Sequence, residues 1–336
     1  MSTRHAQKIA GFTLIEVTIV TVLLAVLVIG VMNFFSTQKK QASVNSQIVD
    51  VQQNSRLLGN LLDSDLRHAG FMVPESSALC GIDRVNAPDT VYVSDAGAIN
   101  ATDEKRHDLA GRIQGGASNI STGSQVLSLD TLVIEFSSPD PAYDTDGDGT
   151  ADSDFRVGAG VIVSDAGNPD RGTACGTVDA ISVGAETITV TIVTSTLAGL
   201  GVGSNVVDLV AVPAHVYEIN GNTQLLRNSA VVANDVEDLQ VAIFLDDDDD
   251  RVVDAGEYRG DGVGPTFDPS NEDISTAREV RANLLIRTRL EDPDNSDGRY
   301  QSSENRTAAA TGDGFRRRVY TSTMTLRNMG SRLPTS

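Results

Sequence analysis

The longest apolar stretch of the sequence lies close to its beginning. Residues 12–35 contain one charged side chain, that of Glu16. As an α-helix this stretch would be about 36 Å long, which exceeds the hydrocarbon thickness of about 30 Å in a typical bilayer. The pattern predicts a membrane-spanning helix. It also suggests that Glu16 has a functional partner, because an ionised carboxylate is costly in hydrocarbon.

Helical spacing continues beyond this apolar stretch. Apolar residues recur at steps of three and four, at Val44, Ile48, Val51, Leu58, Leu62, Leu66 and Ala69. Proline, which would interrupt a helix, is absent before Pro74, and Gly70 supplies a helix stop. The sequence therefore predicts one helix over about 12–69, whose second half covers one face of a sheet with its apolar stripe.

After residue 74 the apolar pattern changes from a helical period to an alternating one, with strands separated by Gly, Asn, Asp and Pro. Residues 187–194 and 282–290 each place apolar side chains on one face and polar side chains on the other. Asn220-Gly221 lies between two short apolar runs and predicts a hairpin. We therefore expect an α+β fold, in which the long helix packs on an elaborated antiparallel β-sheet domain, with no linker between two independent domains.

The charge of the chain limits its partners. The sequence has 336 residues and a formal net charge of -20, which repels nucleic-acid phosphates and anionic headgroups. Trp is absent and aromatic residues make up 4% of the chain, so a stacking platform for bases is poorly supported. No nucleic-acid contact is expected.

Catalytic motifs are also missing from the sequence. The four histidines, His5, His68, His107 and His215, lie in no metal-ligand spacing. The sequence contains no nucleophile elbow and no phosphate-binding loop. We expect a protein that is not an enzyme, with His68 as a polar capping or surface residue.

The two cysteines, Cys80 and Cys175, lie in no metal-like spacing. In an exported chain such a pair most simply forms one disulfide, which would close a loop of about 95 residues and stabilise the fold by about 4 to 5 kcal/mol on the loop-entropy model. Two free buried thiols are the alternative.

Two acidic loops place carboxylates at alternate positions, as calcium-binding loops do. The first has Gly149 at its sixth position and Phe155 at the twelfth, so Asp154 would have to replace the missing glutamate. Its candidate ligands are Asp144, Asp146, Asp148 and Asp152. The second ends in a glutamate at the twelfth position but has Arg251 where a glycine is preferred. Its candidate ligands are Asp246, Asp248, Asp250, the Val252 carbonyl, Asp254 and Glu257. Solvated acidic loops without calcium are the alternative.

The segment before the apolar stretch, residues 1–11, is short and basic. Arg4 and Lys8 favour a cytoplasmic N-terminus and an exported remainder. A secretory signal peptide is the first alternative, but no small-x-small cleavage site follows the apolar stretch and the helical pattern continues. The segment Gly11-Phe12-Thr13-Leu14-Ile15-Glu16 resembles the processing site of type IV prepilins. The resemblance implies cleavage between Gly11 and Phe12 by prepilin peptidase, N-methylation of Phe12, and pairing of Glu16 with the N-terminal amine of a neighbouring subunit.

Later stretches are similar to the PilW family of large minor pilins, namely QQNSRLLGNLLDSDLRHAGF, VEDLQVAIFLDDDDDRVVDAGEY and FRRRVYTSTMTLRN. By this resemblance the chain has a leader (1–11), a transmembrane and filament-core half of the helix (12–35), a periplasmic amphipathic half (36–70) and a β-rich pilin domain (71–336). No similarity is found for about 80–204.

The PilW resemblance implies a structural role in priming pilus assembly and in the tip complex, in pili that serve adhesion and twitching motility. The expected partners are other minor and major pilins, prepilin peptidase and a large tip adhesin. The chain would lie in the inner membrane with a periplasmic C-terminus before assembly, and on the pilus or cell surface afterwards. A GspJ-like minor pseudopilin of a type II secretion system is the main alternative. A calcium-dependent adhesive module would leave the prepilin motif unexplained.

Overall fold

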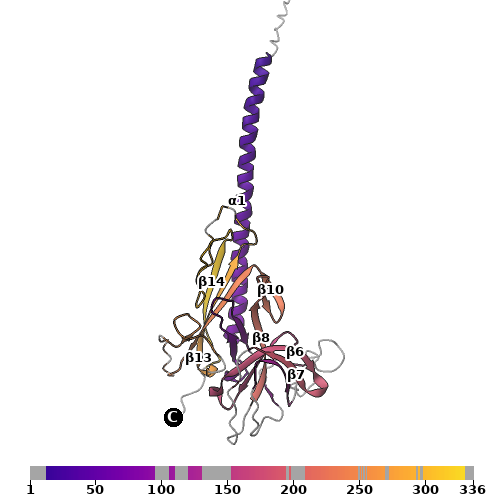
Figure 1. The fold of residues 1–336 in the computed structure, drawn as a ribbon, viewed down its shortest axis with the longest axis vertical. Helices are drawn as coiled ribbons and strands as arrows, with labels where there is room; N and C mark the ends of the chain where they lie inside the picture. The colour runs from indigo at the N-terminus through magenta and orange to yellow at the C-terminus, as the bar shows by residue number, and fades with distance from the viewer. Residues whose placement is uncertain are drawn as a thin grey trace, which may run out of the picture. The chain divides into compact units, whose positions relative to one another are not determined.

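The computed structural model describes residues 13–94, 106–109, 120–130, 153–193, 197, 209–248, 250, 252, 254, 256–268, 272–292, 294–295 and 298–329. The chain divides into two compact units, Met1–Asp50 and Val51–Ser336. Figure 1 shows the long helix and the strands that follow it.

One helix, α1 (Leu14–His68), runs through the boundary between the units. It includes an 18-residue window with a mean hydropathy of 2.8 and no buried residue, so its length and composition are sufficient to cross a membrane. The helix ends where the sequence predicts, because Gly70 adopts a positive φ of 79°. The backbone N–H of Gly70 then donates to Ser94 O at 3.0 Å.

The described strands form two antiparallel sheets. In the ten-stranded sheet, a path β1-β2-β8-β5-β6-β7-β4 is extended by β3 and β9 on β8, and by β10 on β9. Its strands are β1 (Leu79–Ile82), β2 (Thr90–Val93), β3 (His107–Asp108), β4 (Gly123–Ser128), β5 (Gly160–Asp165), β6 (Thr173–Ser182), β7 (Thr187–Ile192), β8 (Leu209–Ile219), β9 (Gln224–Arg227) and β10 (Ala230–Asn234).

The four-stranded sheet has the order β12-β11-β13-β14. Its strands are β11 (Val236–Leu245), β12 (Tyr258–Arg259), β13 (Ala277–Arg287) and β14 (Arg317–Thr325). A short 3₁₀ turn at Glu75–Ser77 lies between α1 and β1, and others at Pro169–Arg171, Val183–Ala185 and Ile274–Thr276 lie between strands. The predicted α+β architecture, a long helix on antiparallel sheets, is confirmed.

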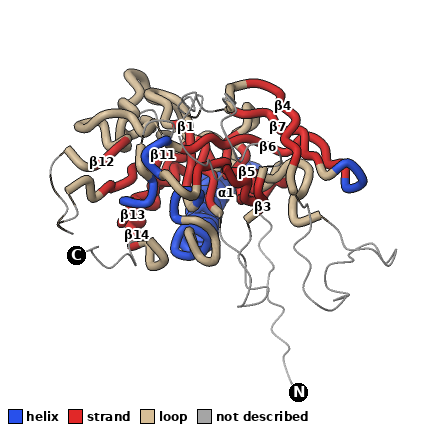
Figure 2. Tube along the Cα trace, turned by 90° about the horizontal axis from the view of Figure 1, so that it is seen from below, coloured by secondary structure: helices blue, strands red, loops and turns tan. Residues whose placement is uncertain are grey.

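The main hydrophobic core joins both sheets to the C-terminal part of the helix. Figure 2 shows strands of the two sheets around the end of α1. The helix contributes buried residues from the predicted stripe, and both sheets contribute apolar residues to the same core. The helix side supplies Val51, Leu58, Leu62, Leu66 and Ala69. The larger sheet supplies Val91, Val93 and Tyr217, and the smaller one supplies Leu239, Val241, Leu284, Ile286 and Met324. Burying these side chains is the main stabilising term for this arrangement.

Two strand predictions have different outcomes. In β7 the residues Ile188, Val190 and Ile192 are buried while the threonines between them are half-buried, as the alternation predicts. In β13 the strand ends at Arg287, and Leu290 is 61% exposed. The prediction that the strand reaches residue 290 is therefore wrong. Thr288 Oγ1 donates to Leu290 O at 3.0 Å, so the chain turns there and leaves the ladder.

The predicted hairpin is confirmed between β8 and β9. Its connection is held by the side chain of Asn220, whose Oδ1 accepts hydrogen bonds from Asn222 N at 3.0 Å and Gln224 N at 3.1 Å. Asparagine is common in such turns because its short side chain can bond the backbone two residues ahead.

Candidate functional site

The first candidate site is the start of α1, where Glu16 pairs with Thr13. The Oε2 atom of Glu16 accepts from the Thr13 backbone N and from Thr13 Oγ1, both at 2.9 Å, and Glu16 N lies 3.4 Å from Thr13 Oγ1. This is a capping box, in which a threonine before the helix and a glutamate three residues later satisfy each other's backbone groups. Both bonds to the carboxylate fall on one oxygen. Sequence reasoning missed this local role of Glu16.

The expected processing residues Gly11 and Phe12 lie outside the described residues. The same is true of Asp144, Asp146, Asp148 and Asp152 of the first acidic loop. Asp154, which would have to replace the missing glutamate there, is described. Its Oδ2 lies 3.2 Å from His107 Nε2, and both side chains are almost fully buried. Phe155 is a core residue packed against the same histidine, with ring centroids 4.9 Å apart.

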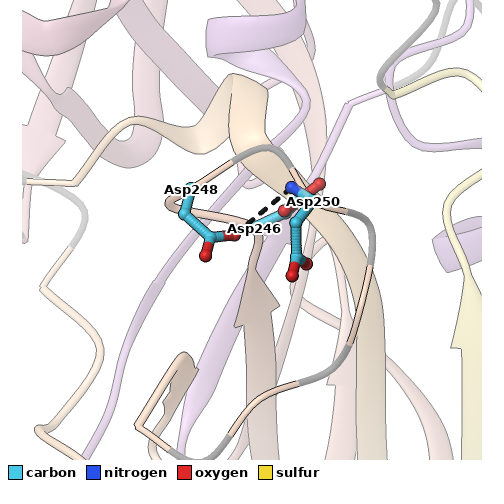
Figure 3. Close-up of side chains that lie close together, drawn as sticks. All are labelled: Asp246, Asp248 and Asp250. Carbon is cyan, nitrogen blue, oxygen red and sulfur yellow. Dashed lines mark hydrogen bonds between the residues drawn. The ribbon is translucent and has the colours of Figure 1, made fainter.

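The second acidic loop brings three of its expected ligands together. Carboxylate oxygens of Asp246, Asp248 and Asp250 lie within 4.8 Å of one another, and Asp250 N donates to Asp248 Oδ1 at 3.2 Å (Figure 3). Asp246 is buried, whereas Asp248 and Asp250 are exposed. Three convergent hard oxygens would supply about half of a calcium coordination shell, which needs six to eight.

Other contacts of this loop are made by the protein itself. Arg278 Nε lies 3.2 Å from Asp246 Oδ2 and gives this buried carboxylate a positive partner. Glu257 accepts from Asp247 N at 3.2 Å and from Asp254 N at 3.1 Å, so its two oxygens hold the loop closed. The expected roles of Glu257, Val252 and Asp254 as ligands stay predictions. The three aspartates fit a cation, and a calcium ion there would have to share Asp246 with Arg278.

Cys80 and Cys175 form a disulfide between β1 and β6, with Cα atoms 6.1 Å apart. The prediction of a disulfide is confirmed, and the alternative of two free thiols is wrong. Both cysteines are buried in a small core with Tyr92, Ile162 and Val216.

A polar network that sequence reasoning missed joins the helix to both sheets. Asp65 Oδ2 accepts from Tyr217 Oη at 2.6 Å and from Arg227 Nε at 2.9 Å. Burial and the neighbouring carboxylate raise the pKa of Tyr217, so the phenol keeps its proton. Asp63 similarly accepts from Ser322 Oγ at 2.9 Å and Tyr320 Oη at 3.2 Å. Acidic residues at i and i+2 near the end of an amphipathic helix are the one sequence signal of this network.

A buried carboxylate, that of Asp89, lies just before β2 of the larger sheet and reaches β11 of the smaller one. Asp89 accepts from Arg84 N and from Val241 N, each at 2.8 Å. Burial raises the pKa of Asp89 to about 8, opposed by these two backbone bonds and reinforced by the nearby charges of Asp83 and Asp238. Burial also raises the pKa of Asp238, although Arg306 binds it at 2.6 Å.

Comparison with known proteins gives one result. The family model described as type IV pilus-assembly protein W, PilW, matches residues 205–328. These findings support a PilW-family type IV pilus protein. No curated protein and no solved structure matches the chain.

The PilW match covers the strands from β8 to β14 and the second acidic loop. The matched region includes the two C-terminal stretches, residues 236–258 and 315–328, whose sequences are similar to PilW. Tyr217, Arg227, Tyr320 and Ser322, which bind Asp63 and Asp65 of the helix, all lie within it. The PilW region thus provides the side chains that fasten the end of α1. The apolar helix is compatible with membrane anchoring, and the family implies interaction with other pilus-assembly components.

Proposed function

We propose that the chain is a structural minor pilin of a type IV pilus, taking part in priming of pilus assembly and in the tip complex. It is made as a prepilin, cut between Gly11 and Phe12 by prepilin peptidase and methylated at Phe12. The PilW match at 205–328, at the far end of a chain that starts with an apolar helix, is the observation that carries this proposal. It favours the pilus over the filament of a type II secretion system.

In this proposal the protein lies in the inner membrane before assembly, with its C-terminal unit in the periplasm. It then leaves with the pilus, in contact with other minor and major pilins and with a large tip adhesin. Removal of the leader takes away Arg4 and Lys8, so the mature formal charge is 24 - 46 = -22. In this acidic chain, the exposed apolar side chains from Leu14 to Phe35 offer an apolar surface for assembly.

Glu16 pairs with the N-terminal amine of a neighbouring subunit in the proposed filament. A carboxylate tolerates a low-dielectric environment far better beside a cation. The capping box uses one oxygen of Glu16, so the second oxygen is available to an incoming amine while the first holds Thr13. The same residue therefore serves the helix start and the subunit contact.

The experiment that tests this role separates charge from capping. Glu16→Gln keeps an oxygen for the capping box but removes the charge, whereas Thr13→Ala removes the side-chain half of the box and keeps the carboxylate. Each variant is expressed with its partner pilins, and their recovery by co-purification is measured. Glu16→Gln should lose most of the partners, while Thr13→Ala should keep them. Full recovery with Glu16→Gln would show that the charge of Glu16 pairs with nothing in the complex.

A further inference from the structure

A groove lies at the end of α1, between the last two turns of the helix and the residues that follow β14. It has a volume of about 600 Å³. Its lining consists of Asn60, Asp63, Ser64, Arg67, His68, Phe71, Arg327 and Asn328. This volume is within the range of about 300–1,000 Å³ that is usual for small-ligand sites, so the groove has room for a few amino-acid residues rather than for a domain.

The walls of the groove are fixed by contacts between the two segments. Asn328 Nδ2 donates to His68 O and Ala69 O, both at 3.3 Å, and so binds the last carbonyls of the helix. Met329 is buried, and its sulfur lies over Gly70, where a Cβ would come within 2.8 Å of it. The groove is therefore formed before any ligand arrives, which reduces the entropic cost of binding.

The charge of the groove is opposite to that of the protein. Arg67 and Arg327 are exposed, and no hydrogen bond or ion pair joins either guanidinium to another described residue. The one acidic group in the lining, Asp63, is turned to Tyr320 and Ser322 through its Oδ2 atom. Two arginines that face solvent beside one engaged carboxylate make a cationic groove in a chain whose formal charge is -20.

The side chains of the groove fit a carboxylate-bearing peptide. A guanidinium presents its N–H groups as a planar fork that matches a carboxylate. Phe71 is 39% exposed beside the arginines and offers an apolar contact. A phosphate ion would make no use of Phe71. Nucleic acid and anionic membranes extend well beyond this groove and would be repelled by the rest of the acidic surface, whereas a short acidic segment can lie within the groove.

We propose that this groove, formed by Arg67, Phe71 and Arg327, binds a short acidic segment of a partner polypeptide, with an apolar side chain of the segment on Phe71. The inference deepens the proposed function and rests on it for the presence of a partner in the pilus. The groove itself can be tested on the isolated protein, apart from processing and assembly.

The experiment uses the full chain in detergent micelles and a fluorescent heptapeptide, Asp-Ser-Asp-Leu-Asp-Ser-Asp, with fluorescence anisotropy as the readout. A peptide with Lys in place of Asp, inorganic phosphate, anionic vesicles and empty micelles are compared under the same conditions. The Asp peptide should bind saturably. The Lys peptide should not, and phosphate and vesicles should compete only weakly.

The matched variants carry equal charge changes. Arg67→Glu with Arg327→Glu reverses both groove charges, and Arg156→Glu with Arg289→Glu reverses two exposed arginines elsewhere. The groove pair should weaken peptide binding at least tenfold, the control pair less than twofold, and Phe71→Ala severalfold. Melting curves confirm that the variants are folded.

Equal losses in both pairs, no saturable binding, or equal binding of the Lys peptide would overturn the proposal. Strong competition by phosphate or vesicles that depends on the same arginines would show that the groove binds anions in general and would overturn the proposal of an acidic peptide. If binding behaves as expected but the protein's N-terminus is found unprocessed, the groove stands and the proposed function fails.

Discussion

Gly59 of α1 lies directly against the aromatic ring of Tyr320 in β14, so closely that a Cβ at Gly59 would overlap the ring carbons. The strands β13 and β14, orange to yellow in Figure 1, run beside this part of the helix. Without a side chain at residue 59 the helix can approach the sheet, and the hydroxyl of Tyr320 reaches Asp63 one turn further on.

Gly59→Ala should therefore destabilise the protein although alanine favours helix. Overpacking costs about 1–3 kcal/mol, which equals or exceeds the gain of about 1 kcal/mol from replacing a helical glycine. Denaturant unfolding of the full chain in detergent measures the difference. Gly184→Ala, at a glycine with open space around its Cβ position, is the control and should change little.

A double-mutant cycle with Tyr320→Ala tests the cause. If the overlap is responsible, Gly59→Ala should cost much less when the ring has been removed. Equal costs with and without the ring would contradict the close approach as the reason for the glycine.

Asp65→Ala should lower the free energy of unfolding by about 1–3 kcal/mol, because it leaves Tyr217 and Arg227 without the carboxylate they bind. Tyr217→Phe should cost less, since the ion pair between Asp65 and Arg227 survives. The control is Asp50→Ala, which removes an exposed carboxylate from the same helix. If thermal melting gives the same stability for both alanine variants, Asp65 does not fasten the helix end.

Asp89 should give the protein a specific pH dependence. Its folded-state pKa of about 8 lies above the ordinary value of 3.8, so the folded protein holds a proton that the unfolded chain releases between these values. The stabilisation from this proton is complete below about pH 4 and is lost as the pH rises toward 8.

Asp89→Asn removes the ionisation, so its stability relative to the unmutated protein should improve from pH 5 to pH 8, by at most about 1.4 kcal/mol per pH unit. Unfolding curves across this range measure the trend, with Asp50→Asn as an exposed control. Parallel pH profiles for Asp89→Asn and the unmutated protein would mean that Asp89 stays ionised in the folded state.

Calcium binding at Asp246, Asp248 and Asp250 stays a prediction that melting can test. Binding to the folded state alone stabilises it by about 2.7 kcal/mol at a hundredfold excess over the dissociation constant. Calcium should raise the melting temperature more than magnesium at equal ionic strength, because magnesium demands strict octahedral geometry. Asp248→Asn should abolish the difference, since Asp248 is an exposed member of the cluster.

The matched control is Asp50→Asn, which changes an exposed aspartate outside the loop. It should keep the calcium-specific shift. Equal shifts with both ions would assign the effect to screening of the chain's negative charge.

Features that depend on neighbouring residues were predictable from the sequence. The helical period, the stop at Gly70, the alternation in β7 and the turn at Asn220 each follow from a few adjacent side chains. The disulfide followed from the cysteine count and the expected export of the chain.

What the sequence could not supply depends on contacts that only the folded backbone brings together. In the sequence Gly59 only lowers the helix propensity of its segment, and its role becomes visible once Tyr320, far along the chain, lies against it. Glu257 has the position of a calcium ligand, but its oxygens are taken by two backbone N–H groups of the same loop. Arg278 reaches Asp246 from β13, a contact that no spacing within the acidic loop reveals.

The central claim is that the protein is made as a prepilin, and mass spectrometry of the N-terminus of the assembled protein tests it most directly. We expect a chain that begins at Phe12 with a methylated amine. Gly11→Ala should leave uncut precursor in the inner membrane, while Ala10→Gly, one residue earlier, should still be processed. An assembled protein whose N-terminus is Met1 or Ser2 would contradict the account.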